Sequence, residues 1–146
     1  MDRDSRARAS CPGRALALSV LLDTNVVVRH LTGVPEAQAR RATELLQSSP
    51  HLRLEDLIVA ETVYVLRSVY RVSREDVAVL LRTVLAYPAI SVRSSEDLLR
   101  ALDLFEIERL DFAEAYLIAV AEVSGFSVAS FDRSLDRVET VTRIEP

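Results

Sequence analysis

The sequence contains no lysine, no tryptophan and only one cysteine, Cys11. All 18 basic residues are therefore arginine, which excludes every mechanism that depends on a lysine side chain. A single cysteine cannot form an intramolecular disulfide, and we expect a reducing, cytoplasmic location. Glycine and proline are also scarce, at 3 and 5 residues, which argues against a disordered or loop-rich chain.

Long hydrophobic runs and an excess of positive charge are missing as well. The apolar stretches extend over about ten residues, short of the roughly 20 that cross a bilayer, so we expect no membrane segment. The apolar stretch before Asp23 has no small-residue cleavage site, and we do not interpret it as a signal peptide. The net charge of −4 means that any contact with nucleic acid needs a local patch or bound cations.

The hydrophobic fraction of 49% in 146 residues predicts one compact domain over 16–146, after a poorly ordered polar tail at 1–15. Apolar runs alternate with helical patterns along that domain, which predicts an α/β fold with a mainly parallel sheet. We expect strands at 16–23, 51–56, 89–93, 126–132 and 139–144. We expect helices at 24–33, 35–49, 57–71, 73–87, 94–110 and 111–125, and a helical turn at 133–138.

Two acidic residues follow apolar strands directly. Asp23 comes after the first expected strand and Asp132 after the fourth. Ligands bind at the carboxyl ends of parallel strands, so both side chains are candidates for a site. Each acid also has a structural explanation, because Asp is a common helix cap and each precedes a helical pattern. The two interpretations of Asp23 are evenly balanced when that residue is considered by itself.

Three further acids lie in predicted helices. Glu61 is in an apolar stretch without a nearby basic partner, so we expect it to face a polar site or a cation rather than a solvated edge. Asp111 and Glu114 open the helix at 111–125 with the spacing of a capping box, which explains one of them without excluding metal binding by the other. His30 and His51 have no metal-ligand spacing, and we expect them to be ordinary surface or packing residues.

These acids become more informative as a set. Carboxylates about 4 Å apart repel by about 4 kcal/mol at an effective dielectric constant of 20, so several of them in one pocket call for a cation. Oxygen ligands without histidine or cysteine select a hard ion, Mg²⁺ or Mn²⁺. Such an ion activates water and neutralises charge on a phosphodiester, which would reconcile an acidic protein with a polyanionic substrate. We therefore expect the acids to point into one pocket.

The order of four motifs, LLDTN, VAE, DFAEA and SFDR, resembles the PIN-domain ribonucleases, and most closely the VapC-like toxins of bacterial type II toxin–antitoxin systems. The resemblance covers roughly residues 18–146. It implies a three-layer α/β/α fold with a mainly parallel central sheet.

By this resemblance, Asp23, Glu61, Glu114 and Asp132 are the catalytic acids and hold one or two Mg²⁺ or Mn²⁺ ions. Glu114 stands where the family usually has Asp, so Asp111 is a further metal ligand that shares or replaces its role. The family often has a further acid two residues after the position of Asp132, and this chain has Ser134 there. The supporting residues implied by the resemblance are Thr24, Asn25 and Ser130.

The implied reaction is metal-assisted hydrolysis of single-stranded RNA that leaves a 5′-phosphate and a 3′-hydroxyl. Arg29, Arg67 and Arg133 are possible phosphate contacts, although a solvated face explains each of them as well. The family also implies a homodimer and a small antitoxin protein that blocks the acidic pocket. The helices at 35–49 and 57–71 would supply a groove for an antitoxin helix, or simply core and dimer interface.

Other enzyme classes fit the sequence less well. Phosphate-receiving signalling domains and haloacid-dehalogenase-like phosphatases, which also place acids at strand ends, normally use a lysine. A P-loop nucleotide binder would need glycines and a lysine that are missing here. The remaining alternative is a PIN-fold module that binds protein or RNA but cleaves little.

Overall fold

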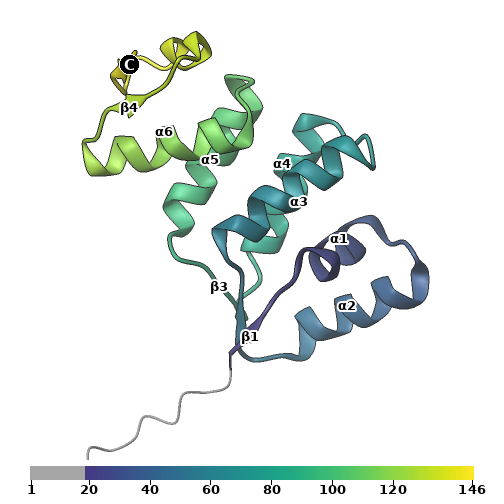
Figure 1. Ribbon diagram of the computed structural model, residues 1–146. Helices are drawn as coiled ribbons and strands as arrows, with labels where there is room; N and C mark the ends of the chain where they lie inside the picture. The colour runs from purple at the N-terminus through teal and green to yellow at the C-terminus, as the bar shows by residue number, and fades with distance from the viewer. Residues whose placement is uncertain (1–18) are drawn as a thin grey trace, which may run out of the picture.

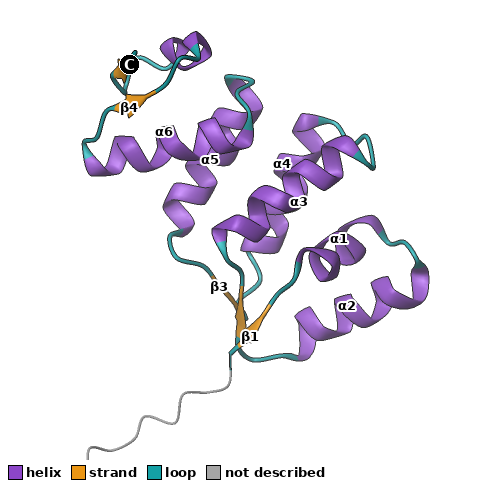
Figure 2. Ribbon diagram, in the orientation of Figure 1, coloured by secondary structure: helices purple, strands orange, loops and turns teal. Residues whose placement is uncertain are grey.

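The computed structural model describes residues 19–146 (Figure 1). The tail predicted at 1–15 lies outside these residues, as does the beginning of the strand predicted at 16–23. None of the helices in the described part of the chain is long and apolar enough to cross a membrane. Helices make up most of the fold, and the strands are short segments between them (Figure 2).

The strands form two separate parallel sheets. The first has the order β1-β2-β3, with β1 at Val20–Leu21, β2 at Leu52–Arg53 and β3 at Ile90–Ser91. The second pairs β4 at Val128–Ala129 with β5 at Arg143–Ile144. The α/β class with parallel strands is confirmed, since every pair is parallel. The strands before Asp23 and Asp132, β1 and β4, belong to different sheets.

Each of the six expected helices is present, with ends close to those predicted. A 3₁₀ helix at Arg133–Arg137 takes the place of the predicted helical turn. The helices are α1 Thr24–Thr32, α2 Glu36–Ser48, α3 Asp56–Ser68, α4 Arg74–Leu85, α5 Ser95–Ile107 and α6 Phe112–Ser124.

Local side chains explain where several helices begin and end. Ser73 accepts a hydrogen bond from the backbone N–H of Asp76 at 3.0 Å, which satisfies a donor that the first turn of α4 leaves free. Gly33 and Gly125 end α1 and α6 with φ of 75° and 69°. Only glycine adopts this left-handed conformation without a steric penalty from Cβ, so both helices stop where the sequence predicts.

The core consists almost entirely of aliphatic side chains on the inner faces of the helices, with Leu66, Leu81, Leu102 and Ile118 fully buried. Helices α5 and α6 pack along each other, and α3 contacts α1 on one side and α6 on the other (Figure 1). Because α3 lies between α1 and α6, residues on its different faces can contribute to a site beside either helix.

Candidate active site

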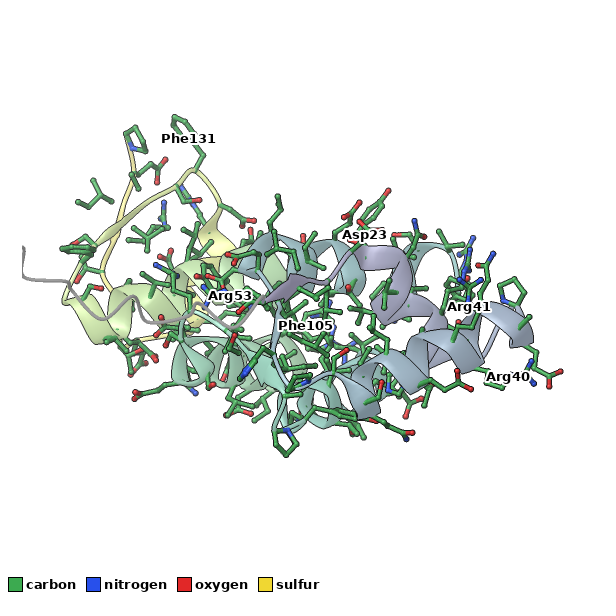
Figure 3. The ribbon with its side chains drawn as sticks, turned by 90° about the horizontal axis from the view of Figure 1, so that it is seen from below. Asp23, Arg40, Arg41, Arg53, Phe105 and Phe131 are labelled. Atoms are coloured by element: carbon green, nitrogen blue, oxygen red, sulfur yellow. The ribbon has the colours of Figure 1, made fainter. Side chains whose placement is uncertain are left out.

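Asp23 lies at the carboxyl end of β1 and is the N-cap of α1. Its Oδ2 accepts a hydrogen bond from the backbone N–H of Asn25 at 3.3 Å. The Asp23 side chain is exposed near the junction between the first sheet and α1 (Figure 3). The capping interpretation is therefore correct, and exposure leaves the second carboxylate oxygen available to a ligand. Asn25 is present as expected, and it contributes its backbone rather than its side chain to this hydrogen bond.

Glu61 on α3 is joined to the residue next to Asp23. The hydroxyl of Thr24 donates a hydrogen bond to Oε2 of Glu61, across the contact between α1 and α3. Thr24 is buried, whereas Glu61 is exposed between two exposed apolar side chains, Leu57 and Tyr64. The expectation that Glu61 avoids a solvated edge is wrong. Its carboxylate is nevertheless oriented by a specific donor, and we call Asp23, Thr24 and Glu61 the Asp23 group.

Asp111 and Glu114 begin α6 as the sequence spacing predicts. The Glu114 side chain accepts a hydrogen bond from the backbone N–H of Asp111 at 3.3 Å, which is one half of a capping box. Glu114 is half-buried, and Asp111 is exposed. Capping occupies one oxygen of Glu114 and leaves the other free to meet a second carboxylate.

That second carboxylate belongs to Asp132, which follows β4. Asp132 Oδ1 accepts a hydrogen bond from the backbone N–H of Ser134 at 2.8 Å, and its own N–H donates to Ser130 Oγ at 3.0 Å. The Glu114 and Asp132 side chains lie within hydrogen-bonding distance of each other. We call Asp111, Glu114 and Asp132 the Asp132 group, with Ser130 as its supporting residue.

The two carboxyls of this pair differ in their electrostatic surroundings. Partial burial and the hydrogen bond with Asp132 raise the pKa of Glu114 above its usual value. The backbone hydrogen bond from Ser134 and the bond with Glu114 lower the pKa of exposed Asp132. Glu114 is therefore the carboxyl of the pair that takes up a proton more readily.

The structure brings the predicted acids together as two groups rather than one. Among the described residues, no three His, Cys, Asp or Glu side chains lie close enough to hold one metal ion. Figure 3 shows Phe131, the neighbour of Asp132, well separated from Asp23. Within 19–146, none of the five acids forms a salt bridge with an arginine, in contrast to Asp136, which pairs with Arg143 at 2.7 Å.

The Asp132 group fits a divalent ion by the chemistry of its donors. Mg²⁺ commonly binds proteins through one or two carboxylates and retains several waters, so the Glu114–Asp132 pair is a sufficient anchor. A cation between these oxygens would attract both of them and relieve their mutual repulsion. The Asp23 group supplies two further carboxylates at the other side of α3.

The arginines proposed as phosphate contacts differ in their surroundings. Arg29 is engaged within the protein, donating to Gln38, to the carbonyl of Val34 and to the Tyr70 hydroxyl. Arg67 uses one nitrogen to donate to the carbonyl of Val72 at 2.7 Å. Arg133 forms no hydrogen bond or salt bridge with another residue that the structure describes. Arg67 and Arg133 therefore have more capacity than Arg29 to contact a substrate.

Sequence reasoning did not identify Asp56, which connects α3 to α6 through hydrogen bonds. Its Oδ2 accepts hydrogen bonds from the Tyr116 hydroxyl at 2.5 Å and from Arg93 Nε at 2.9 Å, which joins α3 to α6. Tyr116 and Arg93 also contact each other. These residues are far apart in the chain, and no local pattern marks them as partners.

A sequence comparison gives an independent result. The model of the PIN domain family matches residues 20–141, a range that includes all five candidate acids. The match, the six helices and the parallel strands agree with the three-layer α/β/α fold expected from the sequence motifs. No curated protein matches the chain.

Proposed function

Since the chain belongs to the PIN domain family, whose members are typically nucleases, we propose that it is an Mg²⁺- or Mn²⁺-dependent endoribonuclease that cleaves single-stranded RNA. The observation that carries this proposal is the pair of carboxyl groups of Glu114 and Asp132, which lie within hydrogen-bonding distance of each other after β4. Two carboxylates held this close, without an arginine between them among the described residues, form a ligand pair for a divalent cation.

The residues of this chain have separate tasks in the proposed reaction. Glu114 and Asp132 bind the ion, and Asp111 provides an alternative carboxylate beside them. Asp23 and Glu61 contribute negative charge from the other side of α3, with Glu61 oriented by Thr24. When bound, the ion supplies an activated water and offsets the charge of the phosphodiester.

Cleavage of a labelled single-stranded RNA in Mn²⁺ tests this function directly. We expect cleavage by the wild type, loss in EDTA, and loss in the Asp23→Asn and Asp132→Asn variants. The products should carry a 5′-phosphate and a 3′-hydroxyl. Absence of cleavage in every condition, without any thermal shift on metal addition, would instead favour a PIN-fold binding module. The absence of a three-ligand metal cluster among residues 19–146 favours that second candidate.

We also propose that the protein acts in the cytoplasm as the toxin of a toxin–antitoxin pair, with a homodimer as its working form. The order of its four acidic motifs supports this. Expression should then arrest bacterial growth, and co-expression of a small protein encoded beside it should relieve the arrest. Growth arrest by Asp23→Asn at equal protein level would contradict a toxic activity that depends on RNA cleavage.

A further inference from the structure

A cleft of about 450 Å³ lies between α3, α4 and the beginning of α6. Tyr64, Arg67 and Ser68 line it from α3, Arg74 lines it from α4, and Asp111 and Ala113 line it from the α6 end. The cleft therefore reaches one candidate metal ligand, Asp111, and its α3 wall carries the neighbours of another, Glu61. A ligand that fills this space would contact Asp111 and the helix that carries Glu61.

The cleft is positively charged in a protein whose net charge is −4. The guanidinium of Arg74 lies 4.2 Å from the centre of the Phe105 ring and donates to the carbonyls of Phe105 and Leu110. Burial, followed by the charges of Arg67 and Arg109, lowers the pKa of Arg74. Three arginines therefore lie near enough to repel one another, which an anionic ligand would relieve.

The polar groups of these arginines are not all satisfied within the protein. Arg74 Nε is buried and has no hydrogen-bond partner among the described residues. Arg109 reaches a carboxylate only at 3.7 Å, from Glu75, and both side chains are largely exposed. Surface pairs of this kind contribute little, and the two arginines that line the cleft, Arg67 and Arg74, exceed its one lining acid, Asp111.

An aromatic side chain stands at the same cleft. Tyr64 is 68% exposed, and it makes no hydrogen bond or ring contact with any residue in 19–146. Exposed aromatic rings beside arginines are the combination with which proteins bind single-stranded nucleic acid, because every base can stack on the ring. The arginines of the cleft supply a local attraction for the phosphate backbone of the nucleic acid. The negative net charge of the protein supplies none.

We propose that this cleft, which we call the α3–α6 cleft, binds one nucleotide of a single-stranded RNA, with its base on Tyr64 and its phosphate near Arg67 and Arg74. The inference rests on the proposed function and specifies where the substrate strand lies beside Glu61 and Asp111. A volume of about 450 Å³ is within the range of ligand-binding clefts. A base paired within a duplex has no free face, so double-stranded RNA should bind more weakly.

The stacking contact can be tested without catalysis. Fluorescence anisotropy of the full chain with a labelled single-stranded RNA of about 12 nucleotides, in EDTA, measures binding alone. We expect Tyr64→Ala to weaken binding on the order of tenfold, and Tyr64→Phe, which keeps the ring, to stay within about twofold of the wild type. The matched control is Phe126→Ala, at an equally exposed aromatic residue outside the cleft.

The phosphate contact has its own readout. We expect Arg67→Ala to weaken binding and to reduce the slope of log K against log salt concentration by about 0.7, the value for one phosphate contact on a single strand. Arg40→Ala is the control, because Arg40 lies on α2 far from Phe105 at the cleft (Figure 3). Thermal melting of each variant identifies any loss of folding, and the exposed Tyr64 variants test the cleft independently of Arg67.

Failure of the inference and failure of the proposed function give different results. If the wild type cleaves RNA in Mn²⁺ while Tyr64→Ala and Arg67→Ala bind as the wild type does, the cleft is not the binding site and the function stands. If binding depends on Tyr64 but nothing is cleaved, the cleft stands and the nuclease proposal fails. No binding by the wild type in EDTA, or equal binding of a duplex, would overturn the inference.

Discussion

The Asp23 group and the Asp132 group hold their carboxylates in different ways. In the Asp23 group, Glu61 receives a hydrogen bond from the Thr24 hydroxyl, so a neutral donor orients a carboxylate. In the Asp132 group, the carboxyls of Glu114 and Asp132 lie within hydrogen-bonding distance of each other, with the pKa of Glu114 raised and that of Asp132 lowered. The second arrangement places two carboxylates next to each other, and these repel when both are ionised. The Asp132 group is therefore the expected anchor of the metal, and the Asp23 group the expected auxiliary.

The largest expected effect tests whether the two groups act as one unit. Asp23→Asn and Asp132→Asn should each reduce the cleavage rate on the order of 10²–10³-fold, as removal of one charge-stabilising group does in other enzymes. If both groups serve the same step, the double variant should lose little more than either single variant. Single-turnover cleavage rates of the four proteins measure this.

If the reduction of the cleavage rate in the double variant equals the product of the two single reductions, the groups contribute independently. Full activity of either single variant would remove that group from the reaction. Asp136→Asn is the matched control, because the Asp136 carboxylate pairs with Arg143 and has no proposed catalytic role.

The second prediction asks which group anchors the ion. A ligand at 100 times its dissociation constant stabilises a folded protein by about 2.7 kcal/mol, so Mn²⁺ should raise the melting temperature of the wild type. Asp132→Asn should abolish this shift, and Glu61→Gln should retain most of it. An equal loss in both variants would contradict the proposed division between anchor and auxiliary. Glu96→Gln, at an exposed position on α5, serves as the control.

The third prediction concerns the positioning role of Thr24. Thr24→Val keeps the shape of the side chain and removes the donor to Glu61. Loss of such an orienting hydrogen bond typically costs 10–100-fold, and we expect a decrease of about that size in the cleavage rate, with little change in RNA affinity. A purely structural role would lower the melting temperature without this separation of rate from affinity.

The smallest expected effect is a pH dependence confined to the region of the Asp23 group. Partial burial lowers the pKa of His30 on α1, whose Nδ1 lies 2.8 Å from Thr43 Oγ1. The unfolded chain takes up a proton near pH 6.5, while the folded protein does so only at lower pH. Stability is therefore lost as the pH falls from about 6.5 through the lowered pKa.

Urea unfolding between about pH 7.5 and pH 5.5 measures this slope, and hydrogen exchange shows where it acts. We expect α1 amides to lose protection before α6 amides. His30→Asn should flatten the slope, and His51→Asn, at an exposed histidine, should leave it unchanged. If the unfolding free energy of His30→Asn depends on pH as strongly as that of the wild type, other groups cause the pH dependence.

Local patterns predicted the helices well because their ends depend on neighbouring residues. Ser73 caps the beginning of α4, and Gly33 and Gly125 end α1 and α6, each within one residue of the ranges predicted at 73–87, 24–33 and 111–125. Strand length was predicted poorly, with two residues observed where five to eight were expected. An apolar run shows that a segment can be buried, but pairing depends on a partner strand that the run does not specify.

The candidate site was also predicted only in part from the sequence. The sequence correctly placed Asp23, Glu114 and Asp132 at the ends of elements. It did not predict that Glu61 is exposed, because the apolar neighbours Leu57 and Tyr64 face outward rather than into the core. The α3–α6 cleft also went unnoticed, since its residues come from helices that only tertiary packing brings together.

Asp23 and Asp111 are each the N-cap residue of a helix, so these acids contribute to folding as well as to the proposed chemistry. Truncation of either residue to alanine would remove a cap along with a charge, and a loss of activity would have two explanations. Asparagine caps helices about as well as aspartate does. Asparagine substitutions at Asp23 and Asp111 thus remove the charge alone and allow fold and function to be measured separately.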